Sequence, residues 1–436
     1  MAAHLRASAQ LSCRRPAKAG HGEPRGYPSS QQRFNRTSGT EMTDLLITNV
    51  RPDAKATADI LIKDGRIAAV APNLPRVPGV QVHDGNDAIA IAPFIEPHVH
   101  LDKILWGLPW HGINAPRTLR EMIDNEVEIR RNLPWGVPER AGNLMRQCVA
   151  MGSTHIRSHI DISTGYKLDN LHGVLEAWEK TKHAVGLELV AFPQTGMMID
   201  PGTADLMEAA LDEGASVIGG IDPGGIDGDP KGHLDTIFDI ASRKGAKVDI
   251  HLHEAGDLGL FEMGLIVERT KALGMQGRVV VSHAFCLGDS QRDKVERMID
   301  MVVEAHIGII SSVPGANVFP PMFELARRGV KCAIASDSLR DTWNPHGNGD
   351  MLERCWLLAY RTGSRTDGKL IECLDMGTRR GADLLDLQGH GLDVGCEGSL
   401  VLIAGENLAQ IVVDRPQRAL VVKNGRIVAR DGKWVD

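Results

Sequence analysis

The sequence has no apolar run of the roughly 18–20 residues that a helix needs to cross a bilayer. It also has no excess of positive charge, because 49 Lys and Arg stand against 56 Asp and Glu and the net charge is −7. Nucleic-acid binding needs a concentrated basic surface, so this balance argues against such a partner. The seven cysteines are scattered without a CxxC pair, which predicts reduced thiols in a cytoplasmic protein and no disulfide framework.

The first 41 residues lack both apolar periodicity and the apolar core of a secretory signal. They carry seven Lys and Arg against two Asp and Glu, and they are rich in Ser, Pro and Gly. Two interpretations remain open. One is an Arg-rich transit peptide, and the other is a disordered extension that comes from an over-long reading of the gene, with Met42 as the natural start. We favour the second and predict a disordered extension over residues 1–42.

Both ends of the remaining chain are rich in β-strand patterns. An Asp-Gly or Asn-Gly turn followed by Arg-Ile occurs at each end, beginning at Asp64 and at Asn424. We therefore predict a small composite β-sandwich built from residues 43–90 and 396–436, with two unrelated hairpins as the alternative. The expected strands are residues 45–50, 58–62, 66–70, 399–403, 419–422 and 426–428.

Residues 91–395 alternate short apolar runs with helical patterns. The runs are rich in Val, Ile and Ala, as in parallel strands that are buried on both faces. Eight β/α repeats over roughly 250 residues predict an α/β fold of the (β/α)8 TIM-barrel type, with a doubly wound open sheet as the alternative. Helices are expected at 203–213 with Thr203 as the cap, at 258–273 and at 289–305. The expected strands are 91–100, 154–161, 187–194, 216–222, 247–253, 278–283, 306–311 and 331–337.

Polar side chains collect where these predicted strands end. In a barrel the carboxyl ends of the strands meet at one mouth, where active sites are built, whereas an open sheet would spread them along an edge. The pattern therefore favours the closed barrel and locates its site. The side chains at the strand ends are His98, His100, His159, Asp161, Gln194, Asp222, His251, His253, His283 and Asp337.

His98 and His100 are separated by one residue on a strand and therefore point to the same face. Two imidazoles in this arrangement can reach one metal ion, although most buried histidines are only hydrogen-bonded. His251 and Asp337 lie where a barrel would bring two further ligands. We therefore predict one divalent metal per subunit, Zn²⁺ or Fe²⁺, held by these four residues.

This order of residues resembles the amidohydrolase superfamily, with an HxH motif on strand one, a His on strands five and six, and an Asp on strand eight. The resemblance spans about residues 43–436 and implies a β-sandwich assembled from both chain ends and a homo-oligomer. Binuclear members use a carboxylated Lys at the end of strand four. Residues 216–225 contain no Lys, which favours a single metal.

Closer similarity is to the bacterial cytosine deaminases and the N-isopropylammelide amidohydrolases of s-triazine breakdown. Residues 93–102 (PFIEPHVHLD) and 190–194 (VAFPQ) look like cytosine deaminases, as does Glu254, three residues past the metal histidine. The chain has Ser338 where cytosine deaminases have a second Asp, and Glu254 where the triazine enzymes have an Asp. The parts that look like the triazine enzymes are Lys103, 219–223, 282–286, 335–341 and 347–351.

The expected chemistry is attack of water on an amino-substituted ring carbon, and each catalytic residue has a role in it. A divalent metal with an open position lowers the pKa of its water to about 7. Asp337 lies beside that water and would take its proton. Glu254 would protonate the ring nitrogen as general acid, and His283 would hydrogen-bond the hydroxide or the intermediate.

The substrate is expected to be a small nitrogen heterocycle, a pyrimidine or an s-triazine. Gln194 matches the family's substrate-amide residue, and its side chain can both donate to and accept from an –NH–C=O edge. Lys103, Trp343 and Ser338 are expected to line the same pocket.

Three functions remain in competition. Deamination of an amino-heterocycle is favoured by Gln194 and Glu254. Hydrolysis of a cyclic or acyclic amide or urea on the same site is the alternative. A non-catalytic scaffold fits least, because every ligand position is filled. His159 and His253 stay open between a structural role and contact with a ligand or substrate.

Overall fold

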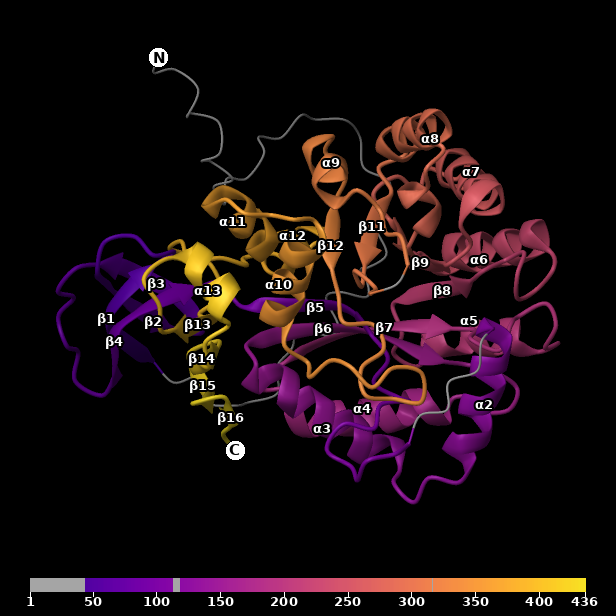
Figure 1. The fold of residues 1–436 in the computed structure, drawn as a ribbon. Coiled ribbons are helices and arrows are strands. Elements are labelled where there is room, and N and C mark those ends of the chain that lie inside the picture. The colour runs from indigo at the N-terminus through magenta and orange to yellow at the C-terminus, as the bar shows by residue number, and fades with distance from the viewer. Residues whose placement is uncertain (1–43, 113–117, 316) are drawn as a thin grey trace, which may run out of the picture.

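The structure is a computed structural model that describes residues 44–112, 118–315 and 317–436. The extension predicted over residues 1–42 lies outside these ranges. Within them the strands form two sheets of eight strands each (Figure 1). None of the helices in these ranges is both long and apolar enough to span a bilayer.

The first sheet joins the two ends of the chain. Its strand order is β16-β15-β14-β13-β4-β1-β2-β3, and in Figure 1 its indigo and yellow strands lie together beside the barrel. The prediction that both ends share one unit is therefore confirmed. The strands are β1 (Leu45–Pro52), β2 (Ala58–Lys63), β3 (Arg66–Ala71), β4 (Gln81–Ile91), β13 (Leu400–Ile403), β14 (Arg418–Lys423), β15 (Arg426–Arg430) and β16 (Lys433–Trp434).

Strand β4 makes this connection and was absent from the sequence prediction. It pairs in parallel with β1 and antiparallel with β13. Its polar first half, which includes residues 83–87, breaks the apolar alternation that identifies a strand. Gly85 lies in this half, where a Cβ would come within 2.1 Å of Val50 Cγ1, at a shift in the register between β1 and β4.

The second sheet is the predicted barrel. Each strand pairs in parallel with its neighbour, and a parallel bridge between Val99 and Asp337 connects the last strand to the first. The Asp337 amide also donates to the His98 carbonyl at 2.8 Å, so the barrel closes and the open-sheet alternative is wrong. The strands are β5 (Phe94–Val99), β6 (Ser153–Asp161), β7 (Gly186–Phe192), β8 (Val217–Ile221), β9 (Lys247–Leu252), β10 (Val279–His283), β11 (Gly308–Ser311) and β12 (Cys332–Ile334).

Helices follow the barrel strands and cover the outside of the barrel (Figure 1). Two of them correct the prediction in detail. α5 begins after Gly202, whose φ is 105°, and Thr203 is not its cap, because the Thr203 hydroxyl donates to Asp200 Oδ2 at 2.7 Å. α8 begins at Arg292 and not at Asp289, because the Asp289 backbone is extended (φ −66°, ψ 158°) and its carboxylate accepts from the Gln291 amide at 2.9 Å. The helices are α2 (Leu119–Arg131), α3 (Val137–Ala150), α4 (Asp169–Thr181), α5 (Thr203–Asp212), α6 (Pro230–Lys244), α7 (Gly256–Ala272), η1 (Phe285–Gly288), α8 (Arg292–Glu304), α9 (Met322–Arg327), α10 (Met351–Arg361), α11 (Asp367–Gly377), α12 (Arg379–Leu384) and α13 (Leu408–Asp414).

The first barrel strand is shorter than predicted. The sequence prediction began it at Ile91, but Ile91 ends β4 and the chain then breaks at Pro93. Proline has no N–H to donate to a strand ladder, so a chain that leaves one sheet for another turns readily at this point. The break sends β5 into the barrel and brings its carboxyl end, with the HxH motif, to the barrel mouth.

Candidate active site

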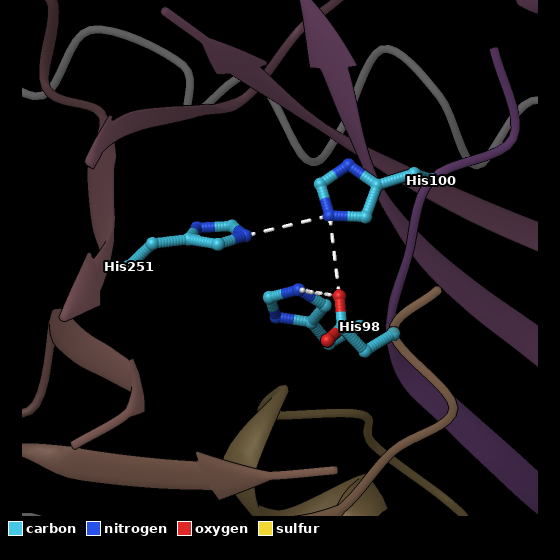
Figure 2. A group of neighbouring side chains, drawn as sticks. His98, His100 and His251 are labelled. Carbon is cyan, nitrogen blue, oxygen red and sulfur yellow. Dashed lines mark hydrogen bonds and ion pairs between the residues drawn. The ribbon is translucent and has the colours of Figure 1, made fainter. Parts of the chain in front are cut away.

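Four predicted side chains meet at the carboxyl ends of β5, β9 and β12. The Nε2 atoms of His98 and His100 each lie 3.4 Å from Asp337 Oδ1, and the Nε2 atoms of His100 and His251 are 3.4 Å apart. One ligand atom from each of the four residues lies within 4.8 Å of all the others. Figure 2 shows the three imidazole rings directed at one point.

The donor set fits a divalent metal. Zinc lies about 2.0–2.1 Å from a histidine nitrogen, so two nitrogens on a tetrahedral ion are roughly 3.4 Å apart. Burial lowers the pKa of His100 and of His251 well below the ordinary value, which keeps both rings neutral with a lone pair to offer. His98 Nε2 is buried and has no hydrogen-bond partner among the described residues. Buried nitrogens facing one another in this way are what a metal ion would satisfy.

The tautomer of His98 follows from its neighbours. The Ser282 hydroxyl donates its one proton to Asp249 Oδ1 at 2.7 Å, and Ser282 Oγ lies 2.8 Å from His98 Nδ1. His98 must therefore donate from Nδ1, which leaves Nε2 as the lone pair directed at the metal site. The His159 ring packs 4.1 Å from the His98 ring, and its Nε2 is 3.6 Å from Asp249 Oδ1. His159, left open by the sequence, thus packs on a ligand ring, and with His98 and Asp249 it forms a second group of neighbouring potential ligand atoms.

Glu96 ties the two strand ends that carry ligands. Its Oε1 accepts from the His98 amide at 3.3 Å and from the Ser336 amide at 3.0 Å, and the side chain is fully buried. Apart from its position before the HxH motif, no sequence feature indicated this role. Asp337 has a φ of 60° and His283 a φ of 71°, a backbone region that costs energy for residues other than glycine. Such strain is concentrated at functional sites, because the surrounding structure must impose it.

His283 and His253 form a stacked pair beside the ligands. Their ring centroids are 4.3 Å apart at an interplanar angle of 24°, and the His283 ring lies 5.1 Å from that of His98. His253 Nδ1 contacts Asp222 Oδ2 at 2.6 Å, and Asp222 Oδ1 accepts from the His253 amide at 2.6 Å. Burial lowers the pKa of His283 well below the ordinary value, so this ring is neutral and can accept or donate one hydrogen bond.

The Glu254 carboxyl lies against the loop that follows β8. Its Oε1 accepts from the Gly225 amide at 2.8 Å, and the carboxyl groups of Asp222 and Glu262 are its acidic neighbours. Burial, followed by these two acidic neighbours, raises the pKa of Glu254 to about 10, so it carries a proton at neutral pH. Glu262, on α7 and fully buried, was missed by the sequence analysis, because no motif marks it.

The predicted substrate residues form a polar wall with one unpredicted partner, Glu126 of α2. Lys103 Nζ donates to Gln194 Oε1 at 2.5 Å and lies 3.5 Å from Glu126 Oε2, while Gln194 Nε2 donates to Glu126 Oε1 at 3.0 Å. Lys103 Nζ also lies 4.3 Å from the centroid of the Trp343 ring. Ser338 follows Asp337, and its carbonyl accepts from Asn344 at 3.1 Å.

The wall continues into a buried ion-pair network. Arg130 contacts Glu126 at 3.1 Å, Asp102 at 3.3 Å and Asp161 at 3.5 Å. These four side chains are at most 8% exposed. Asp161, one of the polar side chains at the predicted strand ends, lies in this network.

A family model for the amidohydrolase family matches residues 139–429 of this chain. The chain belongs to the amidohydrolase family. Over 397 residues it is 26% identical to the N-isopropylammelide isopropyl amidohydrolase of Pseudomonas sp. (strain ADP). The aligned region covers 89% of this chain and 98% of that protein.

Two solved structures are similar to this amidohydrolase. The N-isopropylammelide isopropylaminohydrolase from Burkholderia multivorans ATCC 17616 matches with a TM-score of 0.87 and 40% identity, over 90% of this chain and 100% of that one. The 5-methylcytosine deaminase from Klebsiella pneumoniae, liganded with 5-fluorocytosine, matches with a TM-score of 0.78 and 25% identity, over 90% and 98% of the two chains. The resemblance inferred from the motifs is therefore confirmed.

Proposed function

We propose that this amidohydrolase is a metal-dependent deaminase that hydrolyses an exocyclic C–N bond of a small amino-substituted heterocycle, a pyrimidine or an s-triazine. The observation that carries the proposal is a combination of three features at one barrel mouth. They are the ligand group of three histidines and Asp337, a protonated Glu254, and the polar wall around Gln194. The N-isopropylammelide and 5-methylcytosine enzymes to which the chain is similar support the same substrate class.

We further propose that a single Zn²⁺ or Fe²⁺ is held by His98, His100, His251 and Asp337. When bound, it would supply a water molecule acidic enough to lose a proton near neutral pH. β8 ends at Ile221 and is followed by Asp222, so the strand that supplies a carboxylated Lys to binuclear relatives offers none here.

Each acid–base group has a position suited to its task. Asp337 lies at the ligand cluster and takes the first proton of the attacking water. Glu254, which holds a proton, delivers it to the ring nitrogen beside the attacked carbon. The two protons of water end on the leaving amine and on Glu254, so the enzyme returns to its starting state. His283 is neutral and lies next to the ligands, where it hydrogen-bonds the attacking oxygen.

Gln194 recognises the edge of the ring. Its contacts with Lys103 and Glu126 use one lone pair of its oxygen and one of its two amide hydrogens. One donor and one acceptor therefore remain, which match an –NH–C=O edge. Lys103 and Glu126 fix the amide orientation, because exchanging its oxygen and nitrogen would place like groups together. Trp343 lies against Lys103 and, with Ser338, is proposed to close this side of the pocket.

The test is release of ammonia or amine by the Zn²⁺- and Fe²⁺-loaded protein. The substrates are cytosine, isocytosine, 5-methylcytosine, creatinine, ammeline and N-isopropylammelide. We expect turnover of one ring to dominate and to disappear in His98→Ala. Absence of turnover on the whole panel, with the metal shown to be bound, would contradict deamination and favour hydrolysis of an amide or urea.

A further inference from the structure

Two consecutive backbone amides in the loop after β8 each bind a carboxyl group, one of half-buried Glu254 and one of fully buried Glu262. The Gly224 amide donates to Glu262 Oε1 at 2.6 Å, and the Gly225 amide donates to Glu254 Oε1 at 2.8 Å. A Cβ on Gly224 would lie 2.6 Å from Glu262 Oε1, and one on Gly225 would lie 2.5 Å from Glu254 Oε1. Only glycine permits this approach at both positions, so the loop is shaped to hold the two carboxyls together.

The other oxygens of these carboxyls have no cation to pair with. The Oε2 atoms of Glu254 and Glu262 are buried. Among the described residues, neither atom has a hydrogen-bond partner. Glu254 has the carboxyl groups of Glu262 and Asp222 as its acidic neighbours. Among the described residues, no Lys or Arg forms an ion pair with any of the three carboxyls. The other titratable groups that face them include His253, which pairs with Asp222, His283, which interacts with the charge of Asp222, and the Cys286 thiol of η1.

Carboxylates in such contact cannot all ionise, so the cluster must keep a proton. Asp222 is held ionised by His253, which contacts it twice. The retained proton is therefore shared between Glu254 and Glu262. Of these two, Glu254 lies at the end of the strand that carries His251, whereas Glu262 lies a further two turns along, inside α7.

We propose that Glu262 is a positioning residue that holds Glu254 at the Gly224–Gly225 turn in its proton-bearing form. The proposal rests on the proposed function, in which Glu254 is the proton donor. Each turnover takes one proton from Glu254 and leaves its carboxylate beside Glu262. Repulsion between the two carboxylates favours return of a proton to Glu254 before the next substrate is bound. Without Glu262, Glu254 would lose its proton at a lower pH and would be inactive as an acid over more of the neutral range.

The decisive variant is Glu262→Gln, which keeps the shape of the side chain and removes its charge. Glu268→Gln, an exposed position on the same helix, is the matched control. We expect the alkaline limb of the pH profile of kcat to move down by about one pH unit or more in Glu262→Gln and to stay in place in Glu268→Gln. KM at acidic pH should be unchanged in both variants. A general loss of packing around Glu262 would instead change KM.

Infrared spectroscopy gives a readout that does not depend on turnover. The C=O stretch of a protonated carboxyl that disappears in Glu254→Gln is assigned to Glu254, and its titration is followed from about pH 6 to 9. We expect the band to persist over this range in the wild type and to be lost at lower pH in Glu262→Gln. Absence of the band from the wild type, or an identical titration in Glu262→Gln, would overturn the proposal.

The two proposals fail separately. If Glu254→Gln remains fully active, Glu254 is not the proton donor and the proposed mechanism is wrong, whatever the infrared titration shows. If Glu254→Gln is inactive but the alkaline limb and the infrared band are unaffected by Glu262→Gln, the mechanism stands and the role of Glu262 is wrong. Should Glu262→Gln fail to fold, the wild-type infrared titration alone still decides whether the cluster holds a proton.

Discussion

Buried charge is neutralised in two different ways in this barrel. In the wall around Gln194, the cations Lys103 and Arg130 offset most of the charge of Glu126, Asp102 and Asp161 through ion pairs, and burial raises the pKa of Asp161 to about 7. In the cluster of Asp222, Glu254 and Glu262, no Lys or Arg of the described chain takes part, and bound protons cancel the charge instead. An ion pair fixes its members in place, whereas a shared proton can be given away.

This difference assigns the two regions different tasks. A buried, ion-paired wall is suited to orient a ring, because its hydrogen-bonding groups cannot rearrange without loss of these contacts. A proton held between carboxyls is suited to acid catalysis, because its donor has a pKa above the ordinary range. Each of the following variants disturbs only one of these regions.

The largest effect is expected for Glu254→Gln, which removes the proton donor and keeps the shape of the side chain. We expect kcat to fall by about 10²–10⁴-fold, the usual contribution of a positioned general acid. Metal content and thermal stability should stay near the wild-type values, since no cation is left unpaired. Steady-state kinetics with metal analysis measure this, and a kcat within tenfold of the wild type would count against the assignment.

The paired wall should respond in the opposite way, by losing stability. Glu126→Gln leaves Lys103 without its carboxylate and weakens the hold on Arg130, so we expect about 3 kcal/mol of destabilisation, as for breaking a buried ion pair. Glu128→Gln, exposed on the same helix, is the control. Urea unfolding compares the two, and equal midpoints would show that the wall is not held together by charge.

A third variant tests the uncharged Ser282 hydroxyl, which orients the metal ligand His98. Ser282→Ala removes the hydroxyl that connects His98 Nδ1 to Asp249, so the ring is free to take the other tautomer. We expect metal affinity to fall by about 10–100-fold, the range for loss of a group that orients a ligand. Ser282→Thr keeps the hydroxyl and should restore most of the affinity, measured by competition with a chelator. Equal affinities for the Ala and Thr variants would show that the hydroxyl does not set the tautomer.

The last effect is on the pH dependence of stability. The folded state holds the Glu254 proton above the pH at which an unfolded chain loses it, because the pKa of Glu254 is raised to about 10. Its contribution to stability is therefore complete in acid and is lost as pH rises toward that value. The stability of the wild type relative to Glu254→Gln should decline between about pH 6 and 9. Parallel curves from unfolding titrations would contradict the raised pKa.

The strand-end pattern predicted the barrel and the meeting of His98, His100, His251 and Asp337, because period-two spacing and parallel strand ends are local rules. The family resemblance, in addition, predicted that Lys103, Gln194 and Trp343 line the same pocket. The roles of all these residues remain proposals. Strand β4 was missed, since its first half is polar and its pairing depends on partners distant in the sequence.

The residues that hold the predicted ones in place could not be read from the sequence. Glu126 and Glu262 lie on helices, where a single acidic residue is ordinarily a solvated one, yet both are fully buried. Their partners are 68 residues away for Glu126, at Gln194, and 38 residues away for Glu262, at Gly224. Only the packed structure shows that these carboxyls face inward.

The central claim is tested most directly by the product formed in water labelled with heavy oxygen. Mass spectrometry of the turned-over ring decides it, with the metal-loaded wild type and the His98→Ala variant run side by side. Hydrolytic deamination predicts a product that keeps its ring, has lost one exocyclic nitrogen and carries one labelled oxygen at that carbon, with no product from His98→Ala. A product whose ring has been opened, with all its nitrogens retained, would contradict it.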